Sequence, residues 1–105
     1  MRTIENLLPK LITATEDDRV VWNKSGFTFE AGISGFKVRV WQWHDENSDS
    51  TGYTVQLLSA DDVVLDDIRA NEYSANFTQL EELHGVARRS YNGVDEIIGK
   101  LVNAL

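Results

Sequence analysis

The stretch FTFEAGISGFKVRV, residues 27–40, decides the fold of this chain. Apolar and polar side chains alternate in both of its halves, and this period of two is typical of a β-strand with one buried face. The two halves are joined by a Gly-Ile-Ser-Gly segment, whose residue types favour tight turns between antiparallel strands. The stretch therefore predicts a hairpin in which Phe27 and Phe29 face the core and Lys37 and Arg39 face the opposite side.

Further alternating runs on both sides extend the hairpin into a meander. Val20 and Trp22 mark a short strand before it, and residues 53–57 and 63–68 have strand character after it. Between them, the polar tract 45–52 has no periodicity and predicts an exposed loop. We therefore expect four or five antiparallel strands.

The two ends of the chain have helical spacing instead. Apolar residues near the start recur at steps of three and four, which predicts a short amphipathic helix over about 3–14, bent near Pro9 because proline lacks the N–H that the helix needs. The same spacing returns over 80–105 and passes through Asn92-Gly93 without slipping. We expect one long helix there, with Gly93 as the place where it can bend.

These elements predict an α+β fold. A sheet with one apolar face needs a layer to cover it, and the chain offers a long C-terminal helix and a short N-terminal helix for that purpose. The length of 105 residues and the apolar fraction of 42% suit one core. We therefore expect a single α+β domain over residues 1–105.

Composition excludes several classes of function. The chain has no cysteine, so disulfides and cysteine-based zinc sites are ruled out. A net charge of −7 argues against nucleic-acid binding, which needs clustered Lys and Arg. No window approaches the roughly 18 apolar residues of a membrane span, and the start of the chain does not resemble a signal peptide. We expect a cytoplasmic protein without a cofactor, since no phosphate-binding, metal-binding or nucleophile motif is present.

Trp41 and Trp43 form the most unusual local feature. Strict alternation from Phe36 places both indoles on the polar side of the sheet, where two exposed tryptophans would mark an interface. A β-bulge near Val40 or Trp41 would instead turn both rings into the core, and the N-terminal segment could also cover them. The bulge or the cover is the favoured alternative, and a partner-binding aromatic patch is the other.

Two arginines in the last helix are further candidates. Arg88 and Arg89 are adjacent, so they point about 100° apart and cannot both reach one group. Ion pairs with Glu81, Glu82 or strand aspartates are the expected role, and contact with an acidic partner or the sheet edge is the alternative. The candidate interaction surface therefore comprises Lys37, Arg39, Trp41, Trp43, Arg88 and Arg89.

The chain also resembles a group of short uncharacterised bacterial proteins. The resemblance rests on an N-terminal helix with Thr before a Trp strand, a strand meander, and a last helix with the pattern Leu-x-x-Leu-x-x-x-Ala-Arg-Arg followed by Val-Asp. It implies a bacterial accessory protein and supplies no active site. The matching positions here are Thr13, Thr15, 20–22, Leu80, Leu83, 87–89, 94–95, Ile98, Leu101 and Leu105.

Three hypotheses of function follow. The first is a non-enzymatic protein-interaction module, which can form a homodimer, using the open sheet face or the long helix. The second is an acidic decoy or chaperone for a basic partner protein, suggested by the aspartates of 61–72 and a pI near 4.6. The third is a small ligand-binding domain or enzyme with a pocket near His44, Asp45 or Arg88.

Overall fold

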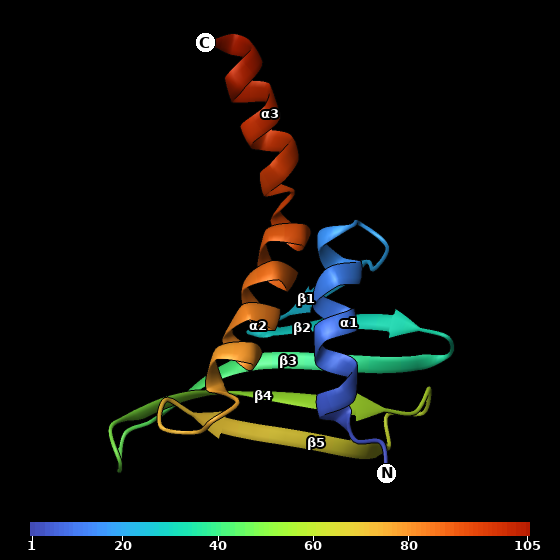
Figure 1. Cartoon of the computed structure of the whole chain (residues 1–105), viewed down its shortest axis with the longest axis vertical. Coiled ribbons are helices and arrows are strands. Elements are labelled where there is room, and N and C mark those ends of the chain that lie inside the picture. Colours follow the sequence, from blue (N-terminus) through green and yellow to red (C-terminus); the bar gives the residue numbers. More distant parts are fainter.

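The computed structural model describes all residues, 1–105, and contains one five-stranded antiparallel sheet and three helices. The strands follow the chain in the order β1-β2-β3-β4-β5, a simple meander (Figure 1). The predicted α+β fold is confirmed. The elements are α1 (Ile4–Glu16), β1 (Trp22–Ser25), β2 (Thr28–Ile33), β3 (Phe36–Asp45), β4 (Ser50–Leu58), β5 (Val64–Asn71), α2 (Phe77–Asn92) and α3 (Val94–Ala104).

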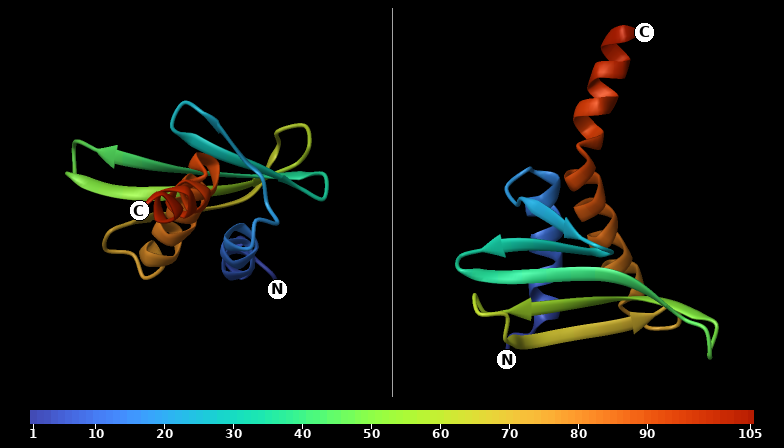
Figure 2. Two further views of the ribbon diagram at one scale, coloured as in Figure 1. Left: turned by 90° about the horizontal axis from the view of Figure 1, so that it is seen from above. Right: turned by 180° about the vertical axis from the view of Figure 1, so that it is seen from behind.

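Helices α1 and α2 lie side by side on one face of the sheet, and the other face is open (Figure 2). One contiguous cluster of 16 buried residues, drawn from both helices and all five strands, fills the space between the layers. Leu8 of α1, Leu83 of α2 and Val40 of β3 are fully buried in it. The apolar face predicted for the meander is thus the face that the helices cover.

The hairpin at the centre of the sequence forms as its residues predict, except at its first residue. Ser34 and Gly35 have φ angles of 53° and 83°, the left-handed pair that matches the twist of a two-residue hairpin turn. Phe29 then pairs with Val40, and both are buried. Phe27 was expected in the core, but it lies in the β1–β2 turn and is 87% exposed. That prediction was wrong because β2 begins only at Thr28.

Helix α1 runs without interruption through Pro9 to Glu16, further than the 3–14 predicted for it. Two hydrogen bonds attach it to the sheet. The Ile4 amide donates to the Asp66 carboxylate of β5 at 2.9 Å, and the Trp22 indole N–H donates to the Thr15 hydroxyl at 3.0 Å. A carboxylate at the first turn of a helix also offsets the positive end of the helix dipole.

Strands β3 and β4 are longer than the sequence indicated. The polar tract 45–52 was expected to be a loop, but Asp45 pairs with Ser50 and His44 pairs with Thr51, so only 46–49 form the turn. The His44 ring also contacts the Thr51 hydroxyl at 3.1 Å. Ser50 is buried at this end of the hairpin, and its hydroxyl forms a 2.6 Å hydrogen bond with the Ser48 hydroxyl, so a polar side chain is accommodated there.

The expected single C-terminal helix is two helices. Gly93 has a φ of 63° and ends α2 in the left-handed conformation, after which α3 begins at Val94. Only α2 packs on the sheet, whereas α3 extends away from it (Figure 1). In none of the three helices do length and apolar character reach what a membrane span requires.

Candidate interaction surfaces

Helix α3 carries a stripe of apolar side chains with nothing packed against it. None of its residues is buried. Ile97, Ile98, Leu101 and Val102 are 46–66% exposed, and Leu105 beyond the helix end is fully exposed. We call these five residues, together with Val94, the α3 stripe. Contiguous apolar surface of this kind on a small protein marks a contact region.

The α3 stripe continues the apolar pattern of α2. In α2 the same spacing places Leu80, Leu83 and Ala87 in the core. One further turn along, Tyr91 packs edge-on against Phe29 with ring centroids 5.9 Å apart but is already 46% exposed. Beyond Gly93 the sheet no longer lies beneath the helix, so the pattern persists without a surface to cover.

Polar contacts fix the base of α3. The Arg89 guanidinium of α2 donates to the Asp95 carboxylate at 2.8 Å, across the break at Gly93. Lys100 and Glu96 form an exposed pair at 3.7 Å. Arg89 was expected to pair with Glu81, Glu82 or a strand aspartate, but its partner lies in α3 because the chain turns there.

The open sheet face carries four of the predicted site residues. Strand β3 pairs without a bulge with β2 from Phe36 to Trp41 and with β4 from Lys37 to Asp45. Its alternate residues Lys37, Arg39, Trp41 and Trp43 therefore share this face. The favoured bulge near Val40 or Trp41 is therefore wrong, and the only irregularity of this sheet lies at Leu57/Leu58 of β4. Both indoles are half-buried, between the two alternatives that the sequence left open.

The Trp43 indole packs against two neighbours on this face. It lies over Gly52 of β4, its pairing partner, where any Cβ would collide with the ring. The Arg69 guanidinium of β5 lies over the ring, 3.8 Å from its centroid. Trp43 thereby contacts a glycine and a cation, which accounts for its partial burial without a core position.

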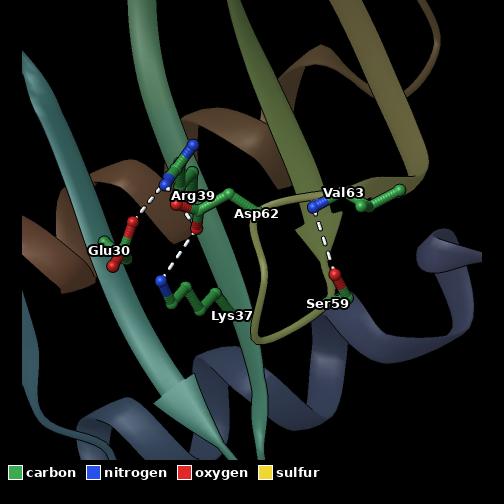
Figure 3. A network of polar contacts seen from close by, with 6 residues as sticks. All are labelled: Glu30, Lys37, Arg39, Ser59, Asp62 and Val63. Atoms are coloured by element: carbon green, nitrogen blue, oxygen red, sulfur yellow. Dashed lines mark hydrogen bonds and ion pairs between the residues drawn. The ribbon is translucent and has the colours of Figure 1, made fainter.

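An ionic network occupies the rest of the open face (Figure 3). The β4–β5 loop brings Asp62 over the sheet, where its carboxylate accepts from Lys37 at 2.8 Å and from Arg39 at 3.0 Å. Arg39 also pairs with Glu30 of β2. A polar hollow of about 530 Å³ beside these residues has no hydrophobic lining. Two of its three cations, Lys37 and Arg39, are paired with its two carboxylates, and the third cation is Lys24.

The network also sets the protonation of its members. The hydrogen bond from Lys37 lowers the pKa of Asp62, and the same bond raises the pKa of Lys37. Both groups are accordingly charged at neutral pH. Lys37 and Arg39, two of the cations that the sequence offered for a partner, are therefore engaged within the chain.

Arg88 lies on the opposite side of the molecule from the tryptophans. With Phe27, Gln42 and His84 it lines a hollow of about 170 Å³ at the end of α2. The His84 ring packs edge-on to Phe29 at 5.4 Å and against Tyr53 at 5.1 Å. Burial, and then the charge of Arg88, lower the pKa of His84. His84 is thus a packed, neutral ring near pH 7.

The six predicted site residues therefore divide between two faces. Lys37, Arg39, Trp41 and Trp43 lie together on the open sheet face, and Arg88 and Arg89 lie on α2, on the other side of the sheet. The α3 stripe was not among the predicted site residues. Its signal was present in the sequence, because the helical pattern over 80–105 is longer than a small sheet can cover.

Comparison with known proteins gives no match. No family model, no curated protein sequence and no solved structure matches this chain.

Proposed function

We propose that this protein is a non-enzymatic protein-interaction module that associates with a second copy of itself through the α3 stripe. The observation that carries the proposal is that α3 has no buried residue and nevertheless presents its apolar side chains on one face. A helix of a globular protein normally buries such a face. Within this chain there is no surface beneath it.

The length of α3 adds a second argument. Isolated helices shorter than about 12–15 residues are marginal in water, and most helices in proteins are stabilised by packing. Helix α3 has 11 residues, and Gly99 in its middle lowers helix propensity further. Docking of the stripe on another surface would supply the missing stabilisation.

The energy available is modest for one helix. Full burial of an aliphatic side chain contributes about 1.5–3 kcal/mol, so hiding the exposed halves of Ile97, Ile98, Leu101 and Val102 would contribute about 4 kcal/mol. Association itself costs at least about 4 kcal/mol. Stable association therefore needs either a closely complementary binding surface for α3 or more than one such contact.

The open sheet face supports the proposal less strongly. Its cations are paired with Glu30 and Asp62, and Arg69 covers one side of Trp43. The acidic decoy hypothesis is also weakened, because Asp62 and Asp66 of the acidic stretch bind groups of this chain. For an enzyme or ligand-binding domain, the polar hollow offers Lys24 as its one cation outside the ion pairs with Glu30 and Asp62. A cytoplasmic location remains part of the proposal, in keeping with the lack of cysteine.

Sedimentation velocity over a concentration series tests the proposal. The unmodified chain should shift from monomer to dimer mass as its concentration rises. Leu101→Asp places a charge in the stripe and should keep the protein monomeric, whereas Asn103→Asp adds the same charge to an exposed residue of the same helix and should not. A chain that stays monomeric at all concentrations, or associates equally well as Leu101→Asp, contradicts the proposal.

A further inference from the structure

A shallow apolar groove of about 460 Å³ runs beside α1. It lies between α1 and the far end of β2, where Ile33 forms one wall. Leu7, Ala14 and Ile33 are only partly buried against the core at this place. The remaining apolar lining comes from Leu11 and Val20.

This groove is a place where a further helix could pack against the protein. The β2–β3 hairpin extends past α1 on the side away from α2 (Figure 1). The pairing of Ile33 with Phe36 places both residues at that end, and Phe36 is 48% exposed. The sheet thus continues beyond the two helices that cover it, and a third helix would complete the layer. The chain has a third helix, α3, which leaves its own sheet uncovered there.

The dimensions of α3 suit the groove. At 1.5 Å per residue, the 11 residues of α3 span about 16 Å, and the segment of α1 from Leu7 to Ala14 spans about 10 Å. Val20, in the loop after α1, adds to the apolar lining. The α3 stripe is therefore long enough to cover the whole groove.

Direction follows from where α3 begins. Asp95 of α3 and Glu16 at the end of α1 line one small hollow, so α3 leaves the body at the end where α1 finishes. It then points away from its own groove (Figure 1). In a pair of copies related by a two-fold axis, the α3 of each copy can run along the α1 of the other in the opposite direction.

Charge favours α3, with its acidic first turn, as the occupant of this groove. Although the chain has a net charge of −7, the two charged residues that line the groove are Lys10 and Arg19. Lys10 forms no ion pair, and the pair of Arg19 with Asp17 is long, at 3.4 Å, and exposed. Antiparallel docking brings the acidic first turn of α3, with Asp95, toward Arg19. It brings the C-terminal, negative end of the α3 dipole toward Lys10.

From the groove, the lengths and the charges we infer that α3 of a second copy docks in this groove, antiparallel to α1, and that two copies exchange their α3 helices reciprocally. The inference rests on the proposed function and names the seat of the same helix. Reciprocal exchange also increases the area buried between the two copies. Stable interfaces bury about 800 Å² on each partner, more than one 11-residue helix face offers, and reciprocal exchange forms the contact twice.

Crosslinking of engineered cysteines tests the seat, because the full chain has no cysteine of its own. Two differently tagged full-length proteins, Lys10→Cys and Val102→Cys, are mixed and treated with a short thiol-reactive crosslinker. Antiparallel docking places Val102 beside the rim at Lys10, so a mixed dimer should form. Ser25→Cys, exposed on the open sheet face, replaces Lys10→Cys as the control. The mixed product should form at least about tenfold faster than the control, because docking raises the effective concentration to the millimolar range.

The outcomes separate the inference from the proposed function. If the dimer forms and depends on Leu101, but Val102→Cys links only to Val102→Cys, then α3 pairs with α3 and the seat is wrong. If Asp95→Cys links to Lys10→Cys in preference to Val102→Cys, the docking is parallel and the inference is also wrong. In both cases the proposed function stands. A protein without any self-association contradicts both.

Discussion

The indole of Trp43 lies directly over Gly52 on the neighbouring strand, and the absence of a side chain at that glycine makes room for the ring. A Cβ at this position would collide with the Trp43 ring on one hand and with the Ala70 carbonyl on the other. The carbonyl belongs to the backbone of β5 and cannot rotate away. The close approach of three strands at this place therefore requires glycine.

Gly52→Ala should lower the free energy of unfolding by about 3 kcal/mol, since overpacking a well-packed site forces backbone shifts. The matched control is Gly32→Ala in β2, where a new Cβ would be 4.0 Å from the nearest atom, the Phe36 carbonyl oxygen. That substitution should change stability by less than about 1 kcal/mol. Urea denaturation measures both. Equal effects at the two glycines would contradict the packing argument.

His84 should make the protein less stable in mild acid. Its pKa is lowered in the folded state by burial and by Arg88, so below about pH 6.5 the unfolded chain binds a proton that the folded chain resists. The contribution of His84 to the free energy of unfolding is therefore fully present above that pH, and it is lost as the pH falls toward and through the lowered pKa. His84→Phe, which keeps an aromatic ring beside Phe29 and Tyr53, should flatten this dependence between pH 7 and 5 in urea melts.

The control for the histidine experiment is His44→Gln, at the half-exposed hairpin position. It should leave the loss of stability between pH 7 and 5 in place. If His44→Gln flattens the dependence and His84→Phe does not, the assignment to His84 is wrong.

Asp62 should titrate below the ordinary range of an aspartate. The hydrogen bond from Lys37 lowers its pKa, and Lys37→Met should move that pKa back up, as NMR titration of the carboxyl carbons would show. Because the folded-state pKa is the lower one, the contribution of Asp62 to stability is present above the unfolded pKa, near 4, and is lost as the pH falls through the folded value.

Two substitutions distinguish the contribution of Asp62 to stability from that of the neighbouring Asp61. Asp62→Asn keeps a residue that tolerates the φ of 65° found there but removes the charge. It should lower stability at neutral pH and have little effect at pH 2. Asp61 forms no ion pair in the structure, so Asp61→Asn should lower stability less at neutral pH. A larger loss at Asp61 would show that the network is not what holds the loop.

Two glycines of the last helices should respond in opposite directions to the same change. Gly93 is left-handed and Gly99 is helical, and at neither does a new Cβ meet an atom within 4 Å. Gly93→Ala should destabilise the joint by about 1 kcal/mol, because L-residues avoid that conformation. Gly99→Ala should stabilise α3 by up to about 1 kcal/mol. Amide hydrogen exchange within α3 reports both, and the same sign for the two would contradict the assigned conformations.

Most of the fold was predictable because its signals are local. The alternation in β2 and β3 and the tight turn between them are set by neighbouring residues, and the structure has both, although the turn takes only Ser34 and Gly35 of the expected segment 32–35. The errors fall where contacts with distant parts of the chain decide whether a residue lies in a strand or in a turn. Phe27 continues the alternation of β2 but lies in a turn, and the polar residues near Ser50 form strand only because their partners are held opposite them.

The candidate surfaces were predictable only in part. Alternation correctly predicts that Trp41 and Trp43 face the same side as Lys37. It contains no information on Arg69, which covers the Trp43 ring, or on Gly52, which leaves room for it. The α3 stripe could have been inferred from lengths. Strands about 4.8 Å apart make a five-stranded sheet about 19 Å wide, and a helix over residues 77–104 would be about 42 Å long.

The hydrogen bond between the Ile4 amide and the Asp66 carboxylate joins residues 62 positions apart. The first helix of the chain is therefore anchored to the last strand of the sheet, in addition to its hydrogen bond with Trp22 of β1. Contacts between such distant residues slow folding, because a long loop must close before they form. During synthesis α1 emerges first, yet this anchor cannot form until β5 has been made, so the last strand of the meander is fixed to the segment with which the chain began.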